Sequence, residues 1–243
     1  MRDRLDDLVQ RLFPGMGLRP LWLTAFASVA MVLYYHHGGG PNGPRWFIEG
    51  STELFDVPHR AFHEHLWAHL AAVVLLMLAP LAASYWLEGW TPLDLGLGVR
   101  GAGKELLVVL ALWAVMVPVV WAVHDQGSFP STYPRFAPAK HSMEMYLLYE
   151  GFYLVKWIAW EFFFRGFMLF GFARDFFQRA VLMSTVPFVL MHFGKPEPEV
   201  LGALLAGLVL CFIALRSKSI WPGVLLHWLV ASTMDFFAAE WWR

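Results

Sequence analysis

The sequence has little charge and almost no cysteine, and each shortage excludes a class of protein. Only 15% of its 243 residues are charged, and the formal net charge is -1. No basic stripe is present to match phosphates, so no nucleic-acid partner is expected. Cys211 is the single cysteine, which excludes an intramolecular disulfide. It lies in an apolar run, where a small packing residue is expected.

Apolar residues are the majority of the sequence. They make up 58% of the chain, and aromatic residues alone make up 17%. An ordinary soluble domain carries more charge and fewer apolar residues than this. The composition therefore predicts a polytopic protein of the lipid bilayer.

Seven apolar runs are candidates for membrane spans. They are 20–35, 66–87, 106–123, 146–172, 180–193, 200–215 and 220–239. Polar or Gly/Pro-rich stretches separate them, for example 38–44 and 124–141. We therefore expect an all-α transmembrane helix bundle of about seven spans. Residues 1–140 would form a surface helix and three spans, and residues 141–243 a four-helix membrane core.

The N-terminal residues and the loop charges predict an orientation. Residues 1–18 alternate charged and apolar positions, which is typical of an amphipathic helix on a membrane surface. No signal peptide is expected, because no apolar core with a small-residue cleavage site follows closely behind the start. A cytoplasmic N-terminus places most loop lysines and arginines inside, among them Arg100, Lys104, Arg216 and Lys218. The positive-inside rule thus favours a multi-pass protein of the plasma (inner) membrane with its N-terminus in the cytoplasm.

Two charged residues interrupt the apolar run 146–172 near its middle. A charge in hydrocarbon costs about 2.5–3.5 kcal/mol, so Glu161 and Arg165 need partners or a polar cavity. Their i, i+4 spacing places them on one helix face, where they can pair. The pair is either structural, allowing a polar face to pack inside the bundle, or part of a functional site.

Two later spans each place a histidine at a comparable depth. Counted from the expected cytoplasmic ends, Glu161 and His192 lie about a dozen residues deep and His227 about eight, or roughly 12–18 Å. Each group alone would destabilise its span, so three at one level predict a shared cavity.

A second group of histidines lies at the entrance to the second span. His59 and His63, and then His65 and His69, each have the i, i+4 spacing that can chelate a metal on a helix. Solvated interfacial histidines are the alternative. A protein that binds metal or haem through this group is a further alternative for function.

The order of these residues in the last hundred positions resembles the CPBP intramembrane proteases, also called the ABI family. That family contains CAAX prenyl proteases and bacteriocin-processing enzymes, and its motifs are Glu-Glu-x-x-x-Arg, Phe-x-x-x-His and His-x-x-x-Asn or Asp. Glu161 and Arg165 match the first motif, Phe188 and His192 match the second, and His227 opens the third. The resemblance implies an intramembrane endopeptidase that hydrolyses a peptide bond of a membrane-associated protein or peptide.

Two positions depart from the family pattern. Trp160 stands in place of the first glutamate, which by resemblance activates the attacking water, and Ala231 stands where the third motif has Asn or Asp. Glu150 lies on the same helix face as Glu161, and Asp235 on the same face as His227, so either could supply a carboxylate. These departures leave open a non-catalytic relative that binds a peptide or lipid.

We assign provisional catalytic roles to four residues. Glu161 and His192 would hold and activate a water, His227 would donate to the oxyanion, and Arg165 would orient Glu161. No cofactor is expected, although Glu161, His192 and His227 are also the ligand types of many catalytic zinc sites.

Other residues are expected to support the site or contact the substrate. After His192, Pro196 and Pro198 prevent a regular helix, so we expect a polar loop that forms a mouth over the cavity. The supporting or substrate-contacting set is Glu150, Phe188, Lys195, Glu199 and Asp235.

Overall fold

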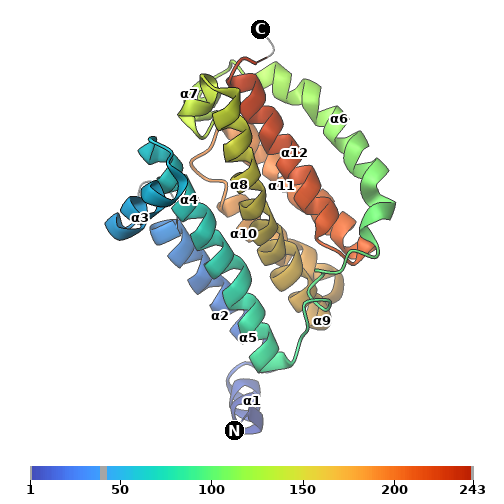
Figure 1. Ribbon diagram of the computed structural model, residues 1–243. Helices are drawn as coiled ribbons and strands as arrows, with labels where there is room; N and C mark the ends of the chain where they lie inside the picture. Colours follow the sequence, from blue (N-terminus) through green and yellow to red (C-terminus); the bar gives the residue numbers. More distant parts are fainter. Residues whose placement is uncertain (1, 39–42, 242–243) are drawn as a thin grey trace.

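The computed structural model describes residues 2–38 and 43–241, and these residues form helices and no strands (Figure 1). The first half contains α1 (Arg2–Leu12), α2 (Leu18–Leu33), η1 (Tyr34–Gly38), α3 (Arg45–Phe55), α4 (Arg60–Ala72), η2 (Val73–Leu78), α5 (Ala79–Glu88), η3 (Ala102–Glu105) and α6 (Leu106–Val123). The second half contains α7 (Phe129–Thr132), η4 (Ala137–Lys140), α8 (Met143–Glu161), η5 (Phe162–Phe170), α9 (Gly171–Phe176), η6 (Phe177–Arg179), α10 (Ala180–Leu190), α11 (Glu197–Ser217) and α12 (Trp221–Ala238). The expected all-α class is confirmed.

Four helices in the described part of the chain are long and apolar enough to cross a membrane. They are Leu18–Gly38, Arg60–Glu88, Ala102–Val123 and Glu197–Ser217. The count of seven is not confirmed. Of the other expected spans, α10 has 11 residues and is roughly 17 Å long, shorter than the hydrocarbon thickness of about 30 Å. The helices α8 and α12 carry ionisable residues inside their apolar runs.

The helix that begins with α8 is central to the bundle. It packs between α4 on one side and α12 on the other, and α6 covers the far side of α12 (Figure 1). Behind it, α10 packs against η5 and α11. Because α8 and η5 contact every one of these layers except α6, side chains near their junction are removed from solvent.

At that junction the helix widens from α to π geometry, directly after Glu161. Phe162, Phe163, Phe164 and Phe167 of η5 are fully buried, and aromatic side chains of this size contribute much of the burial energy of a core. A π turn changes the direction in which successive side chains point, and such turns are common at functional sites. Here the π segment begins directly after Glu161 and contains Arg165.

Several expected loops contain helices. Between the first two apolar runs lies α3, which packs against α4. The expected loop 38–44 lies partly outside the described residues. The expected polar loop at 194–199 is also wrong in part, because α11 begins at Glu197. Pro198 does not prevent this, since the first turn of a helix needs no backbone N–H from proline.

Candidate active site

Glu161 lies at the end of α8 and is completely buried. Its Oε1 atom accepts a hydrogen bond from Nδ1 of His227 at 2.7 Å and another from Nη1 of Arg165 at 3.1 Å. The ion pair expected from the i, i+4 spacing is therefore present. One carboxylate oxygen holds a cation from its own helix and an imidazole from α12.

Arg165 is buried as deeply as its partner. Its guanidinium lies over the ring of Phe188, 4.1 Å from the ring centroid, while Nε and Nη2 have no hydrogen-bond partner among the described residues. A cation in such a place depends on its counter-ion, because loss of one partner leaves an uncompensated buried charge. Glu161 is the only ion-pair partner of Arg165 in the described chain.

His227 is held from two sides. Its ring stacks on Trp157 of α8 with 3.8 Å between centroids and 29° between planes, while Nδ1 donates to Glu161. Its side chain keeps 13% exposure, unlike the closed glutamate. Because Nδ1 is used, Nε2 is the ring atom left for a substrate or water.

Gly223, one turn before His227, lets α12 approach the carboxylate. A Cβ atom there would lie 2.9 Å from Oε2 of Glu161, closer than side-chain carbons normally approach. Oε2 has no hydrogen-bond partner in the part of the chain that the structure describes. The glutamate thus has one oxygen held by two donors and a second, buried oxygen that lies beside Gly223.

His192 follows the end of α10 and completes the group. Its Nδ1 donates to the Phe188 carbonyl at 2.7 Å, so Nε2 of the neutral ring is an acceptor. Its ring lies nearly parallel to that of His227, with 6.4 Å between centroids and 13° between planes. The three residues expected at one depth, Glu161, His192 and His227, do lie together.

The two departures from the family pattern are both buried. The Trp160 ring lies edge-on to His192 at 6.3 Å, and its indole Nε1 has no hydrogen-bond partner in the described residues. An indole thus stands beside His192 where the resemblance places a carboxylate. Ala231 is also buried and brings no polar group to the site.

Glu150 and Asp235 belong to a separate polar cluster between α8 and α12. Glu150 accepts from the Ser232 hydroxyl, and Asp235 accepts from the Arg135 backbone N–H at 3.0 Å. The Tyr146 hydroxyl donates to the Ser232 carbonyl at 2.9 Å. No hydrogen bond in the described chain joins this cluster to Glu161, so neither acid replaces the missing glutamate directly.

The expected mouth residues form a third cluster. Lys195 pairs with Glu199 at 2.6 Å, and the Tyr133 hydroxyl donates to the other oxygen of Glu199, also at 2.6 Å. Burial, followed by the nearby Glu199 carboxylate, raises the pKa of Tyr133 well above its usual value. The hydroxyl therefore remains protonated and donates across the physiological range.

We expect reversal of either charge in this cluster to change substrate use without unfolding the protein. Lys195→Glu or Glu199→Lys should change kcat/KM by about tenfold, the size of one hydrogen bond to a charged group. The double exchange, which restores opposite charges, should recover part of the loss. Turnover is measured on a series of peptides, with Lys140→Glu as control, and wild-type turnover in both single variants would remove the mouth hypothesis.

The histidines at 59–69 do not converge on one point. His63 and His65 donate through Nε2 to the carbonyls of Val57 and Arg135, at 2.8 and 2.9 Å. His69 stacks on Tyr153, and the ring of His59 contacts Phe136. In the described ranges, no group of three or more His, Cys, Asp or Glu is placed to hold a metal ion.

Four aromatic contacts around the site were not predicted from the sequence. Trp157 supports His227, and Lys156 lies over the rings of Tyr153, Trp157 and Trp160 at 5.0, 5.1 and 5.7 Å. The i, i+3 and i, i+4 spacing on α8 could have indicated the contacts of Lys156 with Tyr153 and Trp160, because residues so spaced are neighbours on one helix face. Nothing in the sequence indicated the stacking across to α12.

Fold and site together define a helical membrane protein with a buried Glu–His–Arg centre. Residues 144–233, which contain all these groups, match the family model described as type II CAAX prenyl endopeptidase Rce1-like. The resemblance drawn from the motifs is therefore confirmed over this segment. No curated protein and no solved structure matches the chain.

Proposed function

We propose that the protein is an intramembrane endopeptidase of the CAAX-protease-like type, acting on a membrane-associated protein or peptide. The observation that carries this proposal is the Glu161 carboxylate, buried and held by His227 and Arg165, with the His192 ring parallel to that of His227. A purely structural ion pair would not need two histidines from two further helices. The match of residues 144–233 supports the same reaction class.

In the proposed reaction, Glu161 and His192 hold a water and take its proton as its oxygen attacks the peptide carbonyl. A positioned general base contributes about 10²–10⁴-fold in rate. Arg165 fixes the orientation of the carboxylate, and the closed, apolar surroundings strengthen each of these interactions.

His227 is proposed to donate to the oxyanion through Nε2. Since Nδ1 already donates to Glu161, the ring must carry a proton on both nitrogens to do so. The ring carries both protons before the water attacks, and the adjacent carboxylate stabilises that charged form. As the C–N bond breaks, the proton that the base took from water passes to the leaving amine, so the step balances.

The test compares membrane proteins of cells that carry the intact protein with those that carry Glu161→Gln. We expect a cleavage fragment that disappears in the variant at equal protein abundance. Identical fragment patterns would favour the alternative of a non-catalytic relative that binds a peptide or lipid. Trp160 and Ala231 are the observations behind that alternative.

A zinc enzyme using Glu161, His192 and His227 is the second alternative. Two features of the site fit a metal poorly. His227 and Glu161 are hydrogen-bonded to each other, whereas two ligands of one metal ion would each direct a lone pair at it. The Arg165 cation also contacts the same carboxylate. We therefore propose metal-free chemistry. Metal analysis of the purified protein, with activity measured after chelation, distinguishes the two mechanisms.

For the topology we propose a protein of the plasma (inner) membrane with a cytoplasmic N-terminus and seven spans, three of them being the polar-containing α8, α10 and α12. The C-terminus would then lie outside the cytoplasm. We expect a periplasmic-type reporter fused after Arg243 to be active there and a cytoplasmic reporter to be inactive. The reverse pattern would mean an even number of spans or an inverted bundle.

A further inference from the structure

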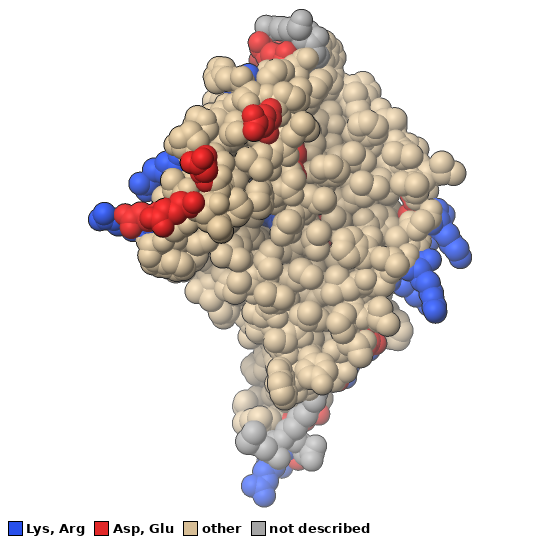
Figure 2. All heavy atoms as spheres, viewed as in Figure 1, with Lys and Arg blue, Asp and Glu red and all other residues tan. Residues whose placement is uncertain are grey.

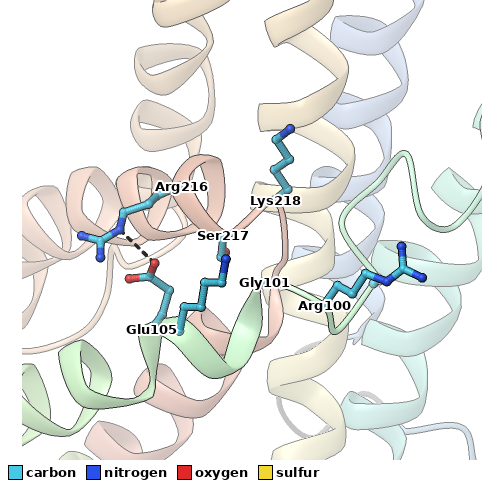
Figure 3. A pocket seen from close by; sticks show the side chains of 8 residues that line it. Arg100, Gly101, Glu105, Arg216, Ser217 and Lys218 are labelled. Carbon is cyan, nitrogen blue, oxygen red and sulfur yellow. Dashed lines mark ion pairs between the residues drawn. The ribbon is translucent and has the colours of Figure 1, made fainter.

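A basic hollow lies where two candidate spans end, and it shares no lining residue with the Glu–His–Arg centre. It has a volume of about 390 Å³ and is formed where η3 leads into α6 and where α11 ends. Its lining includes Arg100, Lys104, Glu105, Arg216, Ser217 and Lys218. Figure 3 shows Arg216 and Glu105 paired on one side and Lys218 and Arg100 on the other.

The hollow is built by close backbone contacts. A Cβ atom on Gly101 would overlap the Ser217 carbonyl oxygen, so only glycine allows the loop to approach the end of α11 this closely. Nearby, the Ser219 hydroxyl donates to the Gly98 carbonyl at 2.6 Å. These contacts fix the loop before η3 against the segment that joins α11 and α12.

Its charges are unbalanced. Arg216 pairs with the buried Glu105 at 2.9 Å, whereas Arg100, Lys104 and Lys218 have no ion pair in the described part of the chain. Elsewhere, Arg19 and Arg174 both pair with carboxylates. Figure 2 shows Lys and Arg side chains gathered at the edge where α6 begins and α11 ends, beside a surface with few charged side chains. Three uncompensated cations around one hollow predict an anionic ligand.

We propose that this hollow binds the phosphate of an anionic phospholipid with a hydroxyl-bearing headgroup. Basic pockets between membrane helices are suited to such headgroups. Exposed apolar residues adjoin the pocket residues along both helices, Leu106 and Leu107 on α6 and Phe212 and Leu215 on α11, where acyl chains would lie. A small water-soluble anion would gain nothing from these side chains, so their presence favours the lipid.

Glu105 adds specificity for the headgroup. It is only 2% exposed, and its Oε2 atom has no hydrogen-bond partner in the described residues, while Oε1 holds Arg216. A headgroup hydroxyl can donate a hydrogen bond to this oxygen. The choline headgroup cannot, because it has no N–H or O–H group. Phosphatidylglycerol carries both the phosphate and the hydroxyl groups and is therefore the probe of choice.

The test measures phosphatidylglycerol binding to the full chain in phosphatidylcholine nanodiscs, by native mass spectrometry across a titration. Lys104→Gln combined with Lys218→Gln should weaken binding roughly 30-fold, since each basic side chain near an anionic lipid contributes about a factor of five. The control is Arg11→Gln with Arg179→Gln, which removes the same charge away from the hollow. Its affinity should remain within about twofold of wild type.

Two further measurements make the result decisive. Glycerol 3-phosphate in solution should compete only weakly, and equal competition by it would replace the lipid with a soluble phosphate compound. Unfolding temperatures of both double variants in phosphatidylcholine alone should agree, because the four side chains are exposed. An equal loss of affinity for phosphatidylglycerol in the two double variants, or no loss of affinity in either, would overturn the proposed site.

Discussion

Glu161→Gln should abolish peptide hydrolysis while the helices remain packed. The amide has nearly the same shape as the carboxylate, and its oxygen can still accept from Arg165 and His227, so both contacts to Oε1 survive. It cannot take a proton from water, and loss of a positioned base costs about 10²–10⁴-fold in rate. The measurement is kcat/KM on a membrane-embedded peptide, with the unfolding temperature of the same preparation.

The appropriate control makes the same chemical change at an exposed helix position. Glu49 of α3 also pairs with an arginine four residues away, but with 59% side-chain exposure. Glu49→Gln should retain full activity. Full activity of Glu161→Gln would show that the membrane carboxylate serves packing alone.

The histidines extend this test, because residues that act as one unit are strongly non-additive. His192→Ala and His227→Ala should each be as inactive as Glu161→Gln, and combining either with Glu161→Gln should add little. If the losses multiplied, the histidines and the glutamate would act in separate steps. His227 and Glu161 would then not act together in one catalytic step, despite the 2.7 Å contact between them.

The sequence predicted which polar residues lie together better than it predicted the aromatic residues around them. The Glu161–Arg165 pair followed from helical spacing, since positions i and i+4 share a face in any regular helix. The approach of His192 and His227 followed from the cost of burying each polar group alone, which requires partners from other helices. Both arguments use only the helical period and the position of a residue along its span, and both can be read from the sequence.

What could not be predicted depends on contacts across helices. The π turn after Glu161 alters side-chain direction, and no local signal marks it. Stacking of Trp157 on His227 requires the relative rotation of α8 and α12, and the role of Gly223 requires their separation. Pro196 and Pro198 predict a break in the helix, but α11 begins at Glu197, because proline is tolerated in a first turn.

Arg165→Met should destabilise the protein more than any surface change. It removes the cation that pairs with Glu161 at 3.1 Å, where both side chains have at most 1% exposure. Breaking a buried pair by removing one partner costs about 3–5 kcal/mol, because the remaining charge is buried without compensation. His227 would still donate to the carboxylate, which places the expected loss in free energy of unfolding near the lower end of that range.

The double variant decides whether charge or shape causes this loss. Adding Glu161→Gln to Arg165→Met removes the stranded charge, so the double variant should be more stable than Arg165→Met alone, measured by unfolding in mixed detergent micelles. Arg45→Met, which breaks the Arg45–Glu49 pair of the same spacing at the surface, should change stability little, because solvent screens exposed pairs. If the double variant were no more stable than Arg165→Met, the stranded charge would not be the cause, and the lost packing of the guanidinium on Phe188 would account for the destabilisation. Glu161 would then be held in place by His227, and the arginine would act on the carboxylate only by filling space beside it.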